Sequence, residues 1–193
     1  MPRRTPLKSE IRNPKSEIGL RRWAAVRLFA MDVDGVLTDG TVVISSDGTE
    51  SKAFSILDGM GMKQLQRAGI VVAWISGRLS DATTRRASEL KIPHLVQGRV
   101  DKLAVLGDLA TRLALTPTQC AYMGDDTIDA PAIGWAGVGI APSEAMPAAL
   151  AAADYVTTRP AGRGAVREVC EHLLSARSAK PRSNPALARS QRQ

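Results

Sequence analysis

The middle of the chain alternates short apolar runs with stretches of helical pattern, and this alternation constrains the fold most strongly. Short apolar runs that end in polar motifs predict buried strands, and the longer periodic stretches between them predict helices. This alternation is typical of a parallel sheet covered by helices, so we expect an α/β protein. The expected strands are residues 26–31, 70–75, 94–96, 120–123, 138–140 and 155–157, and the expected helices are residues 60–67, 81–90, 102–115, 127–133, 145–152 and 164–174.

One segment interrupts the alternation of strands and helices. Residues 41–45 and 50–56 have strand-like sequences, and they flank the pair Asp47-Gly48. An Asp-Gly pair between two strand-like runs is a strong signal for a tight β-hairpin. We therefore predict a β-hairpin at about residues 41–56 that projects beside the sheet, where it would form either a lid or a subunit contact.

The composition and charge of the chain indicate one domain between two basic tails. A length of 193 residues with 44% hydrophobic content suits one domain with a sizeable core, which we assign to residues 25–174. Residues 1–24 and 175–193 are rich in Pro, Ser, Arg and Lys, and we expect both tails to be disordered. The tails carry a net charge of +10, so the domain carries −3 of the total +7.

The charge distribution and hydropathy argue against two classes of partner, although the basic tails leave nucleic-acid binding open as an alternative. Because the basic residues are concentrated in the tails, the domain has no predicted basic face, and we expect no nucleic-acid partner. No apolar segment approaches the roughly 20 residues that a membrane-spanning helix needs, and the amino terminus lacks the apolar core of a secretory signal. We therefore predict a cytoplasmic protein that does not bind membranes.

Two carboxylates follow the first expected strand. Asp32 and Asp34 are two residues apart, so in an extended chain they point to the same side, and Gly35 allows a sharp turn after them. Paired carboxylates are costly without a cation. Mg²⁺ prefers oxygen ligands and can also bind a phosphate group. Ligands of such sheets bind beyond the carboxyl ends of the strands, where this pair falls.

Three further polar motifs follow strands or begin helices. In Ser76-Gly77-Arg78 a hydroxyl, an open amide and a guanidinium suit a phosphoryl group, although a plain turn explains the same residues. Lys102 begins an expected helix and, taken alone, is typical of a solvated charge. The run Gly124-Asp125-Asp126-Thr127-Ile128-Asp129 indicates either metal binding or simple capping of the next helix.

In this order the motifs resemble those of the haloacid dehalogenase superfamily. Together with Asp-Gly-Met-Gly-Met-Lys at 58–63 and Gly-Arg-Gly-Ala-Val-Arg-Glu at 162–168, they resemble in detail those of the 3-deoxy-D-manno-octulosonate 8-phosphate phosphatase family. Ser76 replaces the usual Thr, Ser55 replaces the usual Asn, and Ala161 stands where the family tends to have a glycine. The resemblance covers about residues 26–174. The matching segments are Asp-Val-Asp-Gly-Val-Leu-Thr-Asp-Gly at 32–40, Asp-Gly-Met-Gly-Met-Lys at 58–63, Ser-Gly-Arg at 76–78, Ala-Tyr-Met-Gly-Asp-Asp at 121–126 and Gly-Arg-Gly-Ala-Val-Arg-Glu at 162–168.

The resemblance implies a catalytic role for each motif. Asp32 would attack phosphorus, and Asp34 would protonate the departing sugar oxygen and later activate water. Mg²⁺ would be held by Asp32, Asp125 and the backbone carbonyl of Asp34. Ser76 and Lys102 would stabilise the phosphoryl oxygens. Two further acids, Asp126 and Asp129, would orient water or Lys102. The residues implied in substrate binding are Asp34, Ser55, Asp58, Gly59, Lys63, Arg78, Arg86 and Lys102.

The resemblance also implies a fold, an activity and an assembly. The fold would be capless, a Rossmann-like three-layer sandwich with a projecting hairpin. The activity would be Mg²⁺-dependent hydrolysis of 3-deoxy-D-manno-octulosonate 8-phosphate, a step of lipopolysaccharide precursor synthesis. The site would be completed by neighbouring subunits of a homotetramer. Two alternatives remain: a phosphatase for a sialic-acid-type nonulosonate 9-phosphate, and a non-catalytic binding module with the same fold.

Overall fold

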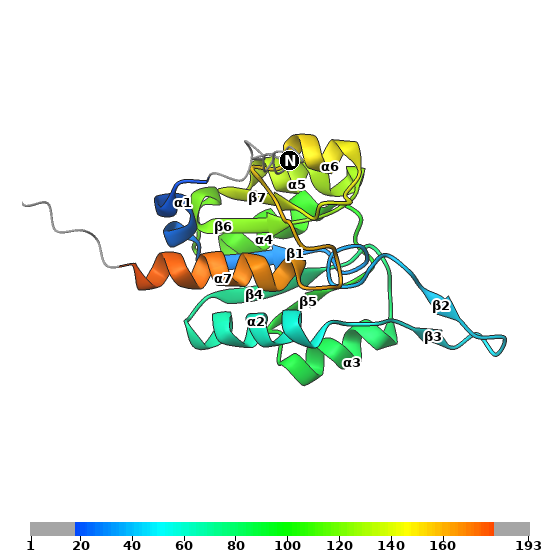
Figure 1. Ribbon diagram of the computed structural model, residues 1–193. Coiled ribbons are helices and arrows are strands. Elements are labelled where there is room, and N and C mark those ends of the chain that lie inside the picture. The colour runs from blue at the N-terminus through cyan, green and yellow to red at the C-terminus, as the bar shows by residue number, and fades with distance from the viewer. Residues whose placement is uncertain (1–17, 180–193) are drawn as a thin grey trace, which may run out of the picture.

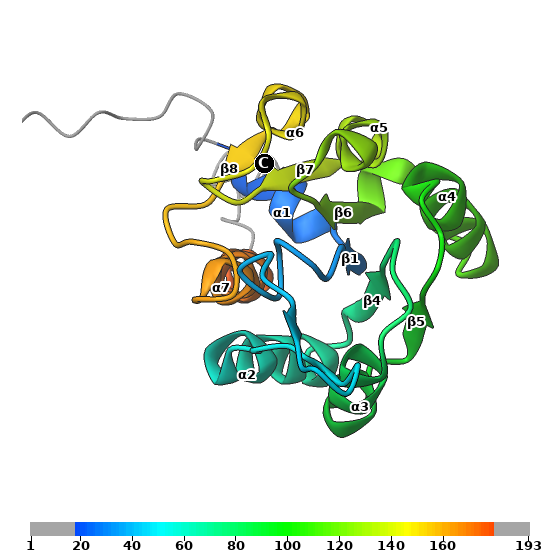
Figure 2. The ribbon, with the colours of Figure 1, turned by 90° about the vertical axis from the view of Figure 1, so that its right-hand side faces the viewer.

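A six-stranded parallel sheet forms the centre of the computed structural model, which describes residues 18–179 (Figure 1). The strand order is β5-β4-β1-β6-β7-β8, so the first strand lies between two strands that come later in the chain (Figure 2). The expected parallel α/β sheet is confirmed. The strands are β1 (Leu28–Met31), β4 (Val71–Ile75), β5 (His94–Val96), β6 (Cys120–Met123), β7 (Val138–Ala141) and β8 (Tyr155–Val156).

Helices cover both faces of the sheet, which gives the expected three layers (Figure 2). The layer on one face contains α1 (Leu20–Ala25), α2 (Ile56–Arg67), α3 (Asp81–Leu90) and α7 (Ala165–Ser178). The other layer contains α4 (Lys102–Arg112), α5 (Ala130–Trp135) and α6 (Pro147–Ala152), and the short 3-10 helices are η2 (Pro117–Gln119) and η3 (Thr127–Asp129).

The sequence of β1 explains why both faces are covered. Phe29 and Met31 point into the core beneath α2 and α7, whereas Leu28 and Ala30 point into the core beneath α4, and all four are fully buried. Successive strand residues point to opposite faces, so a strand without polar positions must be covered on both sides. A central strand covered on both faces is accessible only at its ends, and the polar motif at residues 32–35 follows its carboxyl end.

The predicted hairpin is present and projects from the sheet, but its strands are short (Figure 1). β2 (Val43–Ile44) pairs antiparallel with β3 (Glu50–Ser51), and Asp47 accepts a hydrogen bond from the backbone N–H of Thr49 in the turn. The strand-like sequence continues to residue 56, whereas pairing stops at Ser51 because the chain turns into α2, whose first turn Ser55 caps. Val43 and Ile44 are exposed.

The folded domain is wider than the expected residues 25–174. Helix α1 lies inside the expected amino-terminal tail, where Trp23 is buried and Arg22 donates hydrogen bonds to the Gly137 carbonyl and the Asp154 carboxylate, both at 2.7 Å. At the other end, α7 continues to Ser178 and buries Ala176. The sequence signal for the packing of α1 was Trp23, a large apolar residue in an otherwise basic segment. The predicted disorder of the remaining tails lies outside the described residues.

No helix within residues 18–179 combines the length and apolar character needed to cross a membrane.

Candidate active site

A buried lysine connects the motifs that follow β1, β4 and β6. Because these strands are parallel neighbours, their carboxyl ends lie together. Lys102, the first residue of α4, points its Nζ between them, 2.5 Å from Asp32 Oδ1, 2.7 Å from the Ile75 carbonyl oxygen and 3.6 Å from Asp129 Oδ1. Its side chain is completely buried. A lysine held this way is not the solvated charge that its sequence position suggests when read alone.

Three carboxylates surround this lysine closely enough to share a metal ion. Oxygen atoms of Asp32, Asp125 and Asp129 lie within 4.8 Å of one another. Asp125 Oδ1 is buried and has no hydrogen-bond partner among residues 18–179. Burial, followed by repulsion from Asp32 and Asp129, raises the pKa of Asp125 to about 7. One lysine does not compensate these charges, so the donor set fits a divalent cation.

Asp129 serves these carboxylates chiefly as a support. Its Oδ1 accepts a hydrogen bond from the Tyr122 hydroxyl at 2.7 Å, and its Oδ2 accepts from the backbone N–H groups of Asp125 and Asp126 at 3.2 and 3.1 Å. Both of its oxygens are therefore engaged with the loop that carries Asp125. Asp32 and Asp125 are left as the side chains free to bind a cation, while burial raises the pKa of Asp32 to about 6 despite the opposing charge of Lys102.

Two glycines allow these loops to approach. Gly35 has φ +87°, and a Cβ built there would overlap the Asp125 carboxylate. Gly124 is equally constrained, because a Cβ built there would overlap the side chain of Asp129. The glycines of the Asp-x-Asp-Gly and Gly-Asp-Asp motifs are therefore needed for the contact between the two acidic loops.

Asp34 faces a separate group of charges from the hairpin and the loop after β4. Its Oδ1 lies 2.6 Å from Lys52 Nζ, and its Oδ2 lies 3.9 Å from Arg78 Nε. Arg78 also pairs with Glu50 at 2.8 Å. Sequence reasoning missed Lys52 and Glu50. Their only signal was the alternation of a Glu and a Lys along a hairpin strand, which is equally typical of a solvated face.

Ser76 and Asp126 are found in tight turns at the site. The Ser76 hydroxyl accepts a hydrogen bond from the backbone N–H of Arg78 at 3.1 Å and donates to the Arg78 carbonyl oxygen. It is buried at the carboxyl end of β4. Asp126 is exposed and caps η3 by accepting from the N–H of Thr127, and its role in orienting water or Lys102 stays a prediction.

The remaining expected substrate residues lie on α2 and α3. Asp58 is 1% exposed, and its two carboxylate oxygens accept from the backbone N–H groups of Gly164 and Arg167 at 3.2 and 2.7 Å. Both oxygens of Asp58 thus hold the start of α7, and its contact with substrate stays a prediction. Ser55 caps α2 by accepting from the N–H of Asp58.

Arg86 and Lys63 lie on the layer formed by α2 and α3, and the Arg86 side chain is only 15% exposed. Arg86 pairs with Glu89 at 2.7 Å and donates to the Ser55 carbonyl oxygen, and a Cβ at Gly59 would come within 2.7 Å of its guanidinium. Lys63 lines a hollow between α2 and α3 together with residues of both helices. The structure brings together Asp32, Asp34, Ser76, Arg78, Lys102, Asp125 and Asp129. It places Ser55 at the cap of α2, Gly59 and Lys63 on α2, and Arg86 on α3, outside this group.

Comparisons with known proteins match most of the folded chain. A family model of haloacid dehalogenase-like hydrolases matches residues 45–169. The 3-deoxy-D-manno-octulosonate 8-phosphate phosphatase KdsC of Escherichia coli K12 is 44% identical over 151 residues, which are 78% of this chain and 80% of that protein.

Solved structures agree with the sequence relatives. The phosphatase of the same description from Moraxella catarrhalis, crystallised with a magnesium ion, a phosphate ion and a KDO molecule, is 46% identical with a TM-score of 0.80, covering 81% of this chain and 90% of that one. The cobalt-bound enzyme from Haemophilus influenzae is 36% identical with a TM-score of 0.78, covering 81% and 91%.

Proposed function

This chain belongs to the haloacid dehalogenase-like hydrolases and, within them, to the family of 3-deoxy-D-manno-octulosonate 8-phosphate phosphatases, and we propose that it hydrolyses that phosphate monoester with Mg²⁺ as cofactor. The products are the free sugar acid and phosphate. The observation that carries the proposal is the buried Asp32–Lys102 pair, with the unpartnered oxygen of Asp125 beside it. The nonulosonate alternative is not favoured, because the relatives carry the octulosonate description.

In the first step Asp32 acts as the nucleophile. Its carboxylate oxygen attacks phosphorus, the phosphorus–oxygen bond to the sugar breaks, and the bonding electron pair goes to the sugar oxygen. Asp34 gives that oxygen a proton, so the leaving group is an alcohol rather than an alkoxide. Lys102 holds the attacking carboxylate in place through its ion pair and balances charge on the phosphoryl oxygens.

In the second step water cleaves the aspartyl-phosphate. Asp34, now ionised, takes a proton from the water as the water oxygen attacks phosphorus, and the bond to Asp32 breaks. Phosphate leaves and both carboxylates return to their initial states. Ser76 and Arg78 lie at the carboxyl end of β4, where a hydroxyl and a guanidinium suit the phosphoryl group and the substrate carboxylate.

The carboxylates supply a site for Mg²⁺. We assign Asp32, Asp125 and the backbone carbonyl of Asp34 as its ligands, with Asp129 and Asp126 as supports of the loop. When bound, the ion reduces the repulsion between the Asp32 carboxylate and the phosphate dianion, which amounts to about 4 kcal/mol per charge pair at 4 Å for an effective dielectric of about 20.

We further propose that a homotetramer completes the substrate site. The chain has a hairpin in place of a cap domain, and Val43, Ile44 and Ile56 expose apolar side chains on the hairpin and the start of α2. A neighbouring copy packed there would account for substrate roles of Ser55, Gly59, Lys63 and Arg86, which lie on α2 and α3. The cytoplasmic location and the role in lipopolysaccharide precursor synthesis likewise stay predictions.

A panel of phosphate monoesters tests the substrate assignment. We expect kcat/KM for 3-deoxy-D-manno-octulosonate 8-phosphate to exceed that for a nonulosonate 9-phosphate by about tenfold or more, because the pocket must accommodate one further carbon unit. Phosphate release is measured with Mg²⁺ and after treatment with a chelator, and turnover should disappear without the ion. Equal activity on both sugars would contradict the assignment, and inactivity on every monoester would favour a binding module.

The raised pKa values of Asp125 and Asp32 predict that Mg²⁺ stabilises the protein more at pH 8 than at pH 5.5. Both folded pKa values, about 7 and about 6, exceed the ordinary value of 3.8, so protonation favours the metal-free fold at low pH. The stability that the protonated carboxyls give to the metal-free fold is lost as pH rises through 7, and the ionised carboxylates then bind the cation. Between pH 7 and 6 the apparent affinity for Mg²⁺ should weaken about tenfold per pH unit, and it should weaken more steeply below pH 6, because the ion must then displace a proton from each of Asp125 and Asp32.

Thermal unfolding with and without Mg²⁺ at the two pH values measures this effect. The increase in Tm caused by Mg²⁺ should be large at pH 8 and small at pH 5.5. In Asp125→Asn the pH dependence should diminish, because the group with the higher pKa is gone. An equal increase in Tm at both pH values in the wild-type protein would show that the carboxylates do not gain protons in this range.

A further inference from the structure

Lys52 is a buried cation that the reaction as described does not use. It follows β3 at the base of the hairpin, and its side chain is 0% exposed. A buried ammonium group is costly unless anions and hydrogen-bond acceptors surround it. Lys52 Nζ lies 2.6 Å from Asp34 Oδ1 and 3.7 Å from Glu50 Oε1, and it donates to the Thr83 hydroxyl at 3.5 Å. Its nearest anion is therefore the proposed general acid.

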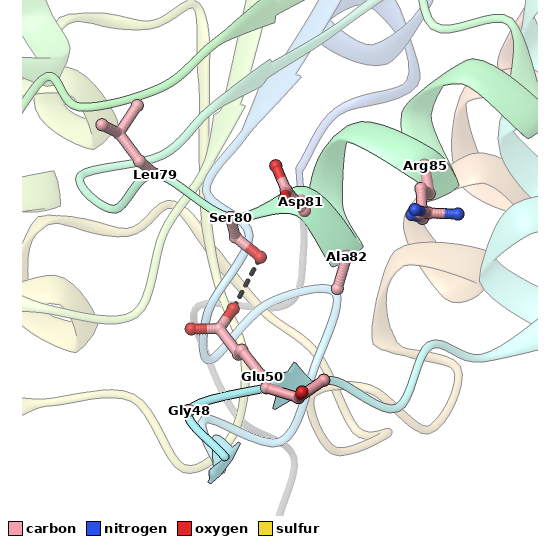
Figure 3. Close-up of a pocket in the computed structure, with 8 residues that line it drawn as sticks. Gly48, Glu50, Leu79, Ser80, Asp81, Ala82 and Arg85 are labelled. Carbon is pink, nitrogen blue, oxygen red and sulfur yellow. Dashed lines mark hydrogen bonds between the residues drawn. The ribbon is translucent and has the colours of Figure 1, made fainter. Parts of the chain in front are cut away.

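Glu50 fixes Lys52 and Arg78 from the hairpin side. One carboxylate oxygen of Glu50 accepts a hydrogen bond from the Ser80 hydroxyl at 2.6 Å, and the other pairs with Arg78 at 2.8 Å. Figure 3 shows Glu50 reaching from β3 toward Ser80, which precedes the first turn of α3. The hairpin is thus connected to the loop after β4 through charged side chains, and Lys52 lies between Glu50 and Asp34.

The burial of Lys52 separates its role from that of the neighbouring Arg78. The Arg78 side chain is 52% exposed and can reach a ligand directly. The Lys52 side chain has no exposed surface, whereas that of Asp34 is 18% exposed. A substrate in the site therefore meets the Asp34 carboxylate, and the Lys52 ammonium group lies behind that carboxylate.

We propose that Lys52 is a positioning residue that holds the Asp34 carboxylate in the orientation needed to protonate the departing sugar oxygen. This inference rests on the proposed phosphatase function. The hairpin then has a role within its own chain, because it carries the cation that fixes the orientation of Asp34. Lys52 acts through Asp34, and it contacts neither the phosphoryl group nor the sugar.

The dependence on leaving group tests this role. Lys52→Met keeps the length of the side chain and removes its charge. An alkoxide leaves poorly without a proton, whereas p-nitrophenolate leaves without one. We expect Lys52→Met to lower kcat/KM about 10- to 100-fold for 3-deoxy-D-manno-octulosonate 8-phosphate and for glycerol 2-phosphate, and less than about threefold for p-nitrophenyl phosphate. Lys52→Arg, which keeps a cation, should recover part of the loss on the two alkyl esters.

Two further variants serve as a control and as a substitute for Lys52→Met. Arg112→Met removes an exposed cation at the end of α4 and should leave all three substrates unchanged. Lys52→Gln, which keeps hydrogen-bond donors, replaces Lys52→Met if the latter does not fold by circular dichroism, and the same substrate pattern is expected.

Other outcomes would overturn the proposal. An equal loss on all three substrates would assign Lys52 to general electrostatics or folding. A loss only on the sugar acid would assign it to recognition of the carboxylate, and no loss would remove it from the reaction. Each of these leaves the proposed function standing, since the wild-type protein remains active. An inactive wild-type protein would instead overturn the proposed function itself.

Discussion

Asp32→Asn is expected to abolish turnover while the fold stays intact. The asparagine amide has the shape of the carboxylate but cannot form an acyl-phosphate, so we expect a loss on the order of 10⁴-fold or more in kcat. Stability should not fall at neutral pH. Burial raises the pKa of Asp32 to about 6, so the metal-free fold does not favour its ionised form, and Asp129 Oδ1 remains 3.6 Å from Lys102 Nζ in the variant.

Steady-state kinetics and thermal unfolding of the same preparation measure both parts of this prediction. The matched control is Asp108→Asn on the exposed side of α4, which makes the same chemical change away from the carboxylates and should keep wild-type turnover. If Asp32→Asn retained more than about a hundredth of the wild-type kcat, attack by Asp32 would be excluded, since nucleophile removal costs far more than that.

Lys102→Met is expected to impair both turnover and stability. It removes the cation from between Asp32 and Asp129, and the loss of one partner from a buried ion pair costs about 3–5 kcal/mol. The charge of Lys102 lowers the pKa of Asp32, so its removal raises that pKa further. We expect the free energy of unfolding of Lys102→Met to fall by this full amount at pH 8, where the Asp32 carboxylate is ionised.

The same variant should be less destabilised at pH 5. At that pH Asp32 is protonated, because its folded pKa lies above 5, and an unpaired neutral carboxyl costs less than an unpaired anion. Chemical denaturation at both pH values in the absence of Mg²⁺ measures the difference. Arg112→Met serves as the control and should change stability by no more than about 0.5 kcal/mol. A loss of stability that did not depend on pH would indicate a packing defect instead of an unpaired charge.

The strands were predictable because burial on both faces leaves a local signal. The expected strands at 94–96 and 120–123 have the observed bounds, and the other strands of the six-stranded sheet differ by at most two residues at one end. The ends of the helices were predicted less accurately than those of the strands. The expected helix 127–133 is divided into η3 and α5 (Ala130–Trp135), because Asp126 caps a 3-10 turn before the helix begins. Local spacing does not distinguish these two helical forms.

The tails illustrate a different limit. Charge and proline content placed residues 18–24 in a disordered tail, but Trp23 packs against His172 of α7 with ring centroids 5.3 Å apart and against Tyr155 at 5.5 Å. The composition of a segment shows which residue types it contains but not where they pack. Whether one aromatic residue finds a cavity in a distant part of the chain is decided by tertiary packing.

The same distinction applies to the site. Asp32 and Asp125 could be named from the sequence because each follows a strand at one edge of a parallel sheet. Lys102 was indicated only by the resemblance to a known family, because its position alone is typical of a solvated charge. No local sequence pattern around Asp58 indicated its structural role, because its carboxylate holds the start of α7 more than a hundred residues away.

The sequence by itself determined the class of fold, the edge of the sheet where the chemistry lies and the carboxylates that follow β1 and β6, because these depend on hydrophobic periodicity and on residues adjacent in the chain. Only the tertiary structure decided which charges meet. Lys52 and Asp34 are separated by a hairpin, and Lys102 and Asp32 by 70 positions, yet each pair is buried together. Electrostatic pairing acts through distance and desolvation, which depend on the packed structure and have no local sequence signal.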